Sequence, residues 1–160
     1  MKIAVISDTH FKHCPAGLES VYKTWLEPAD FLLHCGDITS FDCWSFFLQH
    51  PSFHAVRGNC DWDPQLADMV DPMVTLDIGG LKVGLTHGWG PRPQVPSKVA
   101  QAFGPEYDLV CYGHTHKRDW SVVEGVQLCN PGSFGESGSL ALITVHDDKS
   151  MDCQFLTVDF

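Results

Sequence analysis

The sequence predicts an α/β fold whose strands form two sheets, and three observations support this prediction. Strand-like apolar runs alternate with helical patterns through residues 2–57, an order typical of a parallel sheet with helices packed outside it. Two further strand-like runs are joined by Gly79-Gly80, as in a hairpin. The last third of the chain consists of short strand patterns separated by Gly, Asp or Ser turns. We therefore expect a second, mostly antiparallel sheet there.

The first part of the chain supplies the predicted parallel sheet. Its helices are indicated by apolar residues at helical spacing, such as Leu18, Val21 and Trp25, and each helix is followed by a proline. The expected elements are a strand Lys2–Ile6, a helix Ala16–Glu27, a buried strand that starts at Phe31 and stops at Gly36-Asp37, a helix from about Phe41 to His50, and a strand Phe53–Arg57.

The remaining elements follow in the same way. We expect hairpin strands Val74–Ile78 and Leu81–Thr86, a helix Pro96–Phe103, and strands Asp108–Tyr112, Trp120–Val123, Val126–Leu128, Leu140–His146 and Met151–Val158. No linker or internal repeat interrupts them, and 160 residues are a usual size for one domain. We predict a single domain over residues 1–160. The aromatic residues Trp44, Phe46 and Phe47 either cover a sheet or form a subunit interface, so a homo-oligomer stays open.

Charge and cysteine content limit the partners and the compartment. Ten Lys and Arg stand against twenty Asp and Glu, which disfavours a surface for duplex nucleic acid. A phosphate ligand would then be held by metal rather than by protein cations. The seven cysteines form no Cys-x-x-Cys pair, no signal peptide precedes the first strand, and no apolar stretch is long enough for a membrane span. We expect a cytoplasmic protein with reduced thiols and no membrane partner.

Five predicted strands stop at residues that can bind a metal ion. These residues are Asp8 and His10, Asp37, Asn59, His87, and His114 and His116. Each alone is readily explained as a turn residue, a helix cap or a core histidine. Together they would lie at one edge of the sheets. The pairs Asp8-x-His10 and His114-x-His116 have i, i+2 spacing, which in extended backbone projects both side chains to one side, so we expect each pair to reach into one cluster. The sequence therefore predicts a metal centre.

The chemistry of these side chains favours first-row transition metals. A mixture of Asp, Asn and His suits Mn, Fe, Co, Ni or Zn better than Mg or Ca. Seven candidates are more than one ion with open positions needs. Two ions that share a bridging carboxylate would account for all of them.

The same residues resemble a known family. Asp8-x-His10, Gly36-Asp37, Gly58-Asn59-Cys60-Asp61, His87-Gly88 and Gly113-His114-x-His116 are similar to the five ordered motifs of the calcineurin-like metallophosphoesterases. The similarity is greatest to the small single-domain phosphodiesterase branch, which also includes the retromer scaffold subunit. It implies a two-sheet β-sandwich of mixed strands flanked by helices, with a dinuclear metal site.

The resemblance also implies roles for individual residues. Asp8, His10, Asp37 and His116 would hold one ion, while Asp37, Asn59, His87 and His114 would hold the other. Asp37, Asn59 and His87 are also assigned as catalytic. Two divalent ions, Mn first and Ni, Co, Fe or Zn as alternatives, would share a water and lower its pKa, so that a bridging hydroxide attacks phosphorus. The expected function is hydrolysis of small phosphodiesters; the alternative is a non-catalytic metal-binding scaffold on the same fold.

Three positions near the motifs need separate interpretation. Cys60 stands where larger relatives have a histidine that protonates the leaving group, and a thiol does this less readily. This favours diesters or other substrates with good leaving groups. Trp89 either stacks on a base or aryl group or packs in the protein. His34 lies inside a predicted strand, so we interpret it as a hydrogen-bonded core residue.

Overall fold

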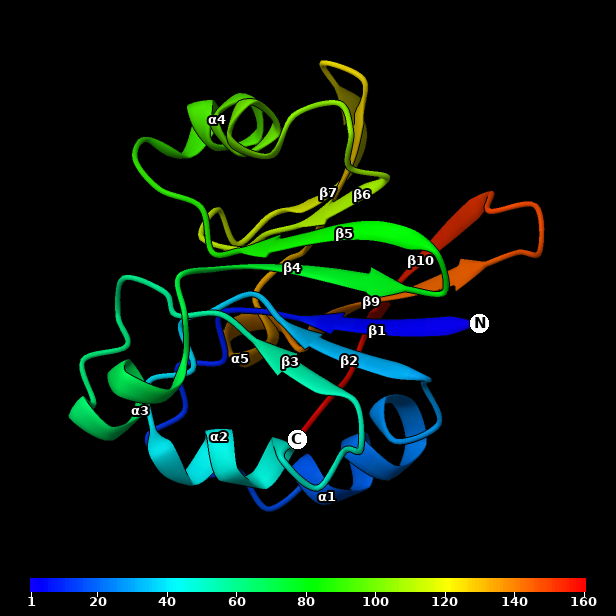
Figure 1. Ribbon diagram of the computed structural model, residues 1–160. Coiled ribbons are helices and arrows are strands. Elements are labelled where there is room, and N and C mark those ends of the chain that lie inside the picture. Colours follow the sequence, from blue (N-terminus) through cyan, green and yellow to red (C-terminus); the bar gives the residue numbers. More distant parts are fainter.

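The computed structural model describes residues 1–160 as ten strands and a set of short helices (Figure 1). The strands are β1 (Lys2–Ile6), β2 (Phe31–His34), β3 (Phe53–Ala55), β4 (Met73–Ile78), β5 (Leu81–Thr86), β6 (Leu109–Cys111), β7 (Arg118–Val123), β8 (Val126–Pro131), β9 (Ser139–Val145) and β10 (Met151–Thr157). The helices are α1 (Leu18–Val21), continued by the π-helix Tyr22–Leu26, then α2 (Phe41–Phe47), α3 (Pro64–Met69), α4 (Val95–Phe103), preceded by a 3-10 turn Arg92–Gln94, and α5 (Phe134–Ser137).

These strands form two five-stranded sheets. The first has the order β10-β9-β1-β2-β3, and the second has the order β4-β5-β6-β8-β7. β1, β2 and β3 pair in parallel, which confirms the predicted parallel arrangement. The hairpin of β4 and β5 is also confirmed, with Ile78 paired to Leu81 across its turn.

The prediction that the last third forms a sheet of its own is wrong. β9 pairs antiparallel with both β1 and β10, so these two late strands extend the first sheet. β7 and β8 join the hairpin and β6 in the second sheet, where β5–β6 and β6–β8 are parallel pairs. The physical reason is that contacts between distant segments decide strand order. β9 lies between β1 and β10, and its side chains are mostly buried on both faces, as in a strand inside a covered sheet.

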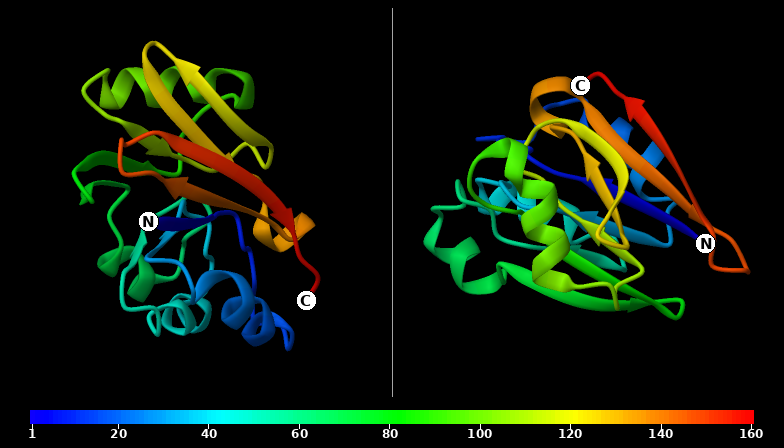
Figure 2. Two further views of the ribbon diagram at one scale, coloured as in Figure 1. Left: turned by 90° about the vertical axis from the view of Figure 1, so that its right-hand side faces the viewer. Right: turned by 90° about the horizontal axis from the view of Figure 1, so that it is seen from above.

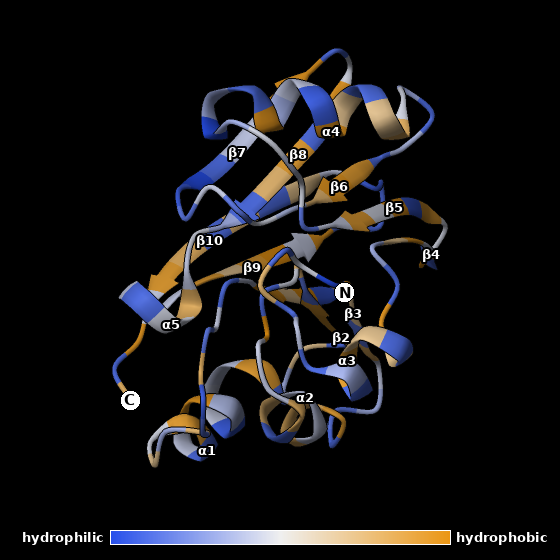
Figure 3. Cartoon of the chain, turned by 90° about the vertical axis from the view of Figure 1, so that its left-hand side faces the viewer, coloured by the Kyte–Doolittle hydropathy of each residue, from blue (hydrophilic) through white to orange (hydrophobic).

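A sandwich of four layers results. The largest buried cluster lies between the sheets and includes Val5, Leu33, Val83 and Ile143. α1 and α2 cover the outer face of the first sheet, and α4 covers the outer face of the second (Figures 1 and 2). Apolar residues run along the strands of both sheets, while the helices carry both polar and apolar residues (Figure 3). None of the helices has the length and apolar character that crossing a membrane requires.

Two short helices were not expected from the sequence. α3 has only one fully buried side chain, Leu66, so it carries no apolar periodicity; its start is fixed by Asp63, whose carboxylate accepts from the N–H groups of Gln65 and Leu66. α5 is a single turn capped by Ser133. The aromatic residues of α2 pack inward: Trp44 and Phe47 are buried, which favours a sheet-covering role for them.

Candidate metal centre

The residues that follow five strands meet at one edge of the sandwich, where β1, β2, β3, β5 and β6 end. Asp8, His10, Asp37, His114 and His116 all have left-handed backbone, with φ between 49° and 67°. The expectation that the i, i+2 pairs are extended is therefore wrong. Left-handed residues turn the chain sharply, and such conformations are uncommon outside glycine. They bring these side chains together at the loop tips rather than along a strand.

Asp8 is fully buried and presents one free oxygen to the site. Its Oδ2 accepts hydrogen bonds from the Ser7 hydroxyl at 2.6 Å and from the His114 N–H at 3.2 Å. Its Oδ1 is buried and has no hydrogen-bond partner. The His116 Nε2 lies 3.1 Å from this oxygen, and the His10 and His87 Nε2 atoms lie at 3.8 and 3.9 Å.

Asp37 is held in the same manner. Its Oδ1 accepts the Cys60 N–H at 2.7 Å, whereas its Oδ2 lies 3.4 Å from the His87 Nε2 and 3.6 Å from the His10 Nε2. The side chain is 4% exposed. A Cβ atom at Gly58 would collide with the Asp37 Oδ1, so this glycine is required for the close approach of the two loops.

His87 completes the buried part of the site. Its Nδ1 lies 2.7 Å from the Cys35 carbonyl, which can only accept, so Nδ1 donates and the Nε2 lone pair faces the two carboxylates. This Nε2 is buried and has no hydrogen-bond partner. We call Asp8, Asp37 and His87 the floor of the site.

The other four predicted ligands, His10, Asn59, His114 and His116, form a more exposed rim. The His116 Nδ1 donates to the Glu136 Oε2 at 2.9 Å, so its Nε2 lone pair points at Asp8. The His114 Nε2 donates to the Gly90 carbonyl at 3.0 Å, and its Nδ1 lies 2.9 Å from the Asn59 Oδ1. His114 and Asn59 thus contact each other at the edge of the site.

Opposite charges in the floor shift the pKa values of its acids and bases in opposite directions. Burial acts to raise the pKa of Asp37, but the His87 imidazole 3.4 Å away and its charge outweigh burial and hold that pKa well below its usual range. Burial acts to lower the pKa of His87, but its contacts with Asp37 and Asp8 raise it overall. The Asp8 carboxylate, 3.8 Å away, likewise raises the pKa of His10.

The donor set fits a divalent cation. Three groups of side chains have ligand atoms within 4.8 Å of one another: Asp8, His10 and His116; Asp8, Asp37 and His87; and His10, Asp37 and Cys60. Where His87 and His116 are neutral, their Nδ1 atoms carry the hydrogen, so their Nε2 lone pairs face carboxylate oxygens with no hydrogen between them. Such buried, unpaired acceptors are costly unless a cation binds between them.

Two acidic residues of the site had no role assigned from the sequence. Asp61 is buried, and its carboxylate accepts the N–H groups of Asp37, Thr39 and Gly58 at 2.6 to 3.0 Å, which ties two loops together. Its place in the Gly58–Asp61 motif was a usable signal. Glu136 has no such signal, because its partner His116 lies twenty residues away in the sequence.

Cys60 and His34 also lie close to the floor. The Cys60 thiol belongs to a group with His10 and Asp37, and burial together with the Asp37 carboxylate raises its pKa to about 11. His34 is fully buried; its Nδ1 accepts the Gly36 N–H, and its Nε2 lies 3.2 Å from the Thr9 hydroxyl. The interpretation of His34 as a hydrogen-bonded core residue is confirmed.

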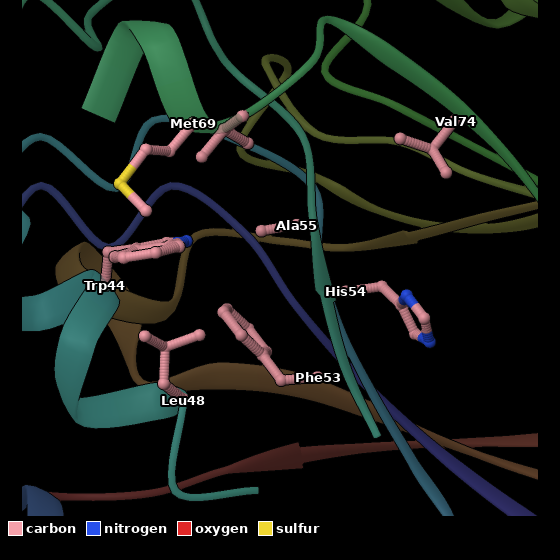
Figure 4. Close-up of a pocket in the computed structure, with 8 residues that line it drawn as sticks. Trp44, Leu48, Phe53, His54, Ala55, Met69 and Val74 are labelled. Atoms are coloured by element: carbon pink, nitrogen blue, oxygen red, sulfur yellow. The ribbon is translucent and has the colours of Figure 1, made fainter. Parts of the chain in front are cut away.

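A separate apolar hollow of about 190 Å³ lies at the edge strand β3, next to α2 and α3 (Figure 4). Its lining consists of Trp44, Leu48, Phe53, His54, Ala55, Met69, Val70 and Val74. It contains no carboxylate, so it offers no ligand set for a metal ion. Trp89, two residues after the floor residue His87 in the sequence, is 42% exposed.

Comparisons with known proteins agree with this geometry. Residues 1–148 match the family model of the calcineurin-like phosphoesterase superfamily domain. The chain is 33% identical to the phosphodiesterase MJ0936 of Methanocaldococcus jannaschii over 82% of this chain and 83% of that protein. It is 28% identical to the probable metallophosphoesterase YsnB of Bacillus subtilis over 94% and 88% of the two chains.

Solved structures give the same fold. A novel archaeal phosphodiesterase superposes with a TM-score of 0.71 at 27% identity, over 98% of this chain and all of that one. A Vps29 mutant of Entamoeba histolytica also has a TM-score of 0.71, over 99% and 100% of the two chains, but at 23% identity this likeness concerns the fold alone. The chain therefore belongs to the calcineurin-like phosphoesterase superfamily and is a phosphoesterase.

Proposed function

We propose that this chain is a dinuclear metal-dependent phosphodiesterase that hydrolyses small phosphodiesters. The observation that carries the proposal is the set of converging acceptors in the floor, where the Asp8 Oδ1 and the His87 Nε2 are buried without a hydrogen-bond partner. A structural core would satisfy these atoms. Their arrangement supports a site built for cations.

The residues divide between two ions as the family resemblance implies. Asp8, His10 and His116 lie together on one side, and His87 lies on the other side with Asn59 and His114 next to it. Asp37 faces both His10 and His87, which suits a bridging role. Mn is the first candidate for both positions, with Ni, Co, Fe and Zn as alternatives.

Two divalent ions, when bound, supply charge that stabilises the phosphoryl oxygens and the acidity that turns a water into a hydroxide nucleophile. Hydrogen bonds within the chain fix the positions of the ligand atoms before any ion binds. The Cys60 N–H and the Cys35 carbonyl fix the orientations of Asp37 and His87, so little reorganisation accompanies the reaction. The chain has only ten Lys and Arg residues against twenty Asp and Glu, which agrees with metal ions rather than protein cations neutralising the phosphoryl oxygens.

The decisive experiment uses protein stripped of metal with a chelator. Hydrolysis of bis(p-nitrophenyl) phosphate and p-nitrophenyl phosphate is measured before and after addition of Mn, Ni, Co, Zn or Mg. We expect a transition metal to restore cleavage of the diester, and Asp37→Asn to abolish it. Asp152→Asn is the matched control, because it makes the same chemical change at an exposed residue outside the site. No turnover with any metal would favour the scaffold alternative.

Cys60 sets the expected limit on substrates. Its thiol is near the His10 and Asp37 ligand atoms but is a weak acid, so we expect slow cleavage of esters whose leaving group needs a proton. Cys60→His should accelerate hydrolysis of an alkyl phosphodiester more than hydrolysis of bis(p-nitrophenyl) phosphate. Equal rates of the variant and the wild type on the alkyl ester would refute this role.

A further inference from the structure

A polar hollow of about 650 Å³ adjoins the candidate metal centre. It is lined by Arg92, Thr115, His116, Lys117, Glu136 and Ser137, none of which is apolar. Its volume falls within the range of about 300 to 1,000 Å³ that is usual for small-ligand sites, although most of those are lined by apolar residues. Because His116 is also a rim residue, a ligand in this hollow would lie next to the floor.

Two basic side chains of the hollow have no partner in the protein. Neither Arg92 nor Lys117 makes a side-chain ion pair or hydrogen bond. Most other basic residues do: Lys23 pairs with Glu19, Lys82 with Glu106, and Arg57, Arg118 and Lys149 donate to carbonyl groups. Lys2, Lys12 and Lys98 also lack such a partner, but they do not line this hollow.

The other polar groups of the hollow are already occupied. The Thr115 hydroxyl accepts from the Asn130 amide, the Ser137 hydroxyl donates to the Ser133 carbonyl, and the Glu136 Oε2 accepts from His116. The Glu136 Oε1 is free but belongs to a negatively charged carboxylate, so the groups left to attract an anion are the two cations. In a chain of net charge −10, two unpaired cations on one hollow mark a site for an anion.

We propose that this hollow binds a second phosphate group of the substrate, so that the preferred substrates are phosphodiesters that carry a further phosphate. This inference rests on the proposed phosphodiesterase function. The guanidinium of Arg92 matches a phosphate in a two-point fork, and the ammonium of Lys117 adds a point charge. The scissile phosphodiester would lie at the floor, and the second phosphate would reach past His116 to the two cations.

The first test compares two substrates that differ only in the second phosphate. Thymidine 5′-(p-nitrophenyl phosphate) and its 3′-phosphorylated form share the scissile bond and the leaving group. We expect kcat/KM of the metal-loaded wild type to be about tenfold higher for the 3′-phosphorylated form, the effect of roughly one charge-assisted hydrogen bond. The double variant Arg92→Gln/Lys117→Gln should bring this ratio close to one.

The matched control is Lys23→Gln/Lys82→Gln, which removes the same charge from exposed surface ion pairs away from the hollow. It should retain the tenfold ratio. Arg92 and Lys117 are themselves exposed, so the melting temperature should be little changed in both double variants. An equal kcat/KM for the two substrates, or a ratio that survives in Arg92→Gln/Lys117→Gln, would overturn the inference.

A binding measurement separates this inference from the proposed function. Calorimetry of metal-loaded protein compares thymidine 3′,5′-bisphosphate with thymidine 5′-monophosphate, and it needs no turnover. Tighter binding of the bisphosphate that is lost in Arg92→Gln/Lys117→Gln supports the anion site even if neither ester is cleaved, in which case the proposed function fails alone. Cleavage of both esters without any preference, together with equal binding, leaves the proposed function standing and refutes the anion site.

Discussion

The floor and the rim of the site both consist of side chains that can bind a metal ion, but the protein holds them differently. In the floor, atoms of Asp8, Asp37 and His87 that do not face the site are bonded to backbone groups or to Ser7. In the rim, His116 relies on Glu136, whose side chain is 71% exposed, and His114 on Asn59 and the Gly90 carbonyl. The floor therefore sets the geometry, and the rim can adapt to a ligand.

The largest difference should appear when a floor ligand is compared with a rim ligand. Asp8→Asn removes the charge of a buried carboxylate, and we expect metal affinity to fall by more than the about 10- to 100-fold that loss of an outer hydrogen-bond partner costs. His114→Gln should cost less, because it touches only the exposed edge of the site. Isothermal calorimetry with Mn measures both. Equal losses in the two variants would mean that floor and rim do not differ.

The next effect concerns the support of the floor. Asp61→Asn weakens an acceptor of three backbone N–H groups and leaves an amide group facing them. The free energy of unfolding should fall by about 1 to 3 kcal/mol. Metal affinity should fall with it, because the N–H of Asp37 is one of the three donors. Denaturation by urea measures the first, with Asp68→Asn, an exposed residue, as the control. Unchanged stability would show that the two loops do not need this carboxylate.

A smaller effect is expected from the support of the rim. Glu136→Gln replaces the charged acceptor of the His116 Nδ1 with a neutral one at an exposed position. We expect about a tenfold loss of metal affinity, the low end of what such outer partners contribute, with the melting temperature of the metal-free protein unchanged. The ¹⁵N shifts of His116 should also report a weaker preference for the tautomer that carries its proton on Nδ1. Ser137→Ala is the neighbouring control, and the same loss there would contradict a role for Glu136.

How far the sequence predicts the molecule depends on whether a feature is local. Asp37 and His87 were found because each follows an apolar strand directly, so position and residue type lie within a few residues. The support from Glu136 was missed because it depends on α5 packing against the first loop, where the Ser133 hydroxyl and the Gly135 N–H both bond the Asp8 carbonyl.

The errors have the same origin. The pairs Asp8-x-His10 and His114-x-His116 were expected to be extended, but their backbone is left-handed, a choice that tertiary contacts impose. The residues of β9 have the pattern of an ordinary apolar strand. They do not specify that β9 pairs with β1 rather than with a strand close to it in the sequence. Sheet order and loop conformation are decided by contacts between distant segments, which a single sequence does not display.

The last expected effect lies beneath the floor, at His34. Burial lowers the pKa of this imidazole from 6.5 to about 3. The unfolded chain therefore binds a proton between these values that the folded chain does not, so this contribution to stability is complete above pH 6.5 and is lost as the pH falls towards 3. The slope from this one group is at most about 1.4 kcal/mol per pH unit.

His34→Gln removes the imidazole that takes up this proton when the chain unfolds. In the presence of a chelator, the free energy of unfolding of His34→Gln should fall less steeply between pH 6 and 4 than that of the wild type, by up to one proton, whatever the variant does to stability at neutral pH. The matched control is His13→Gln, which removes an exposed imidazole. If both variants flatten the slope equally, the burial of His34 beneath the floor carries no acid sensitivity.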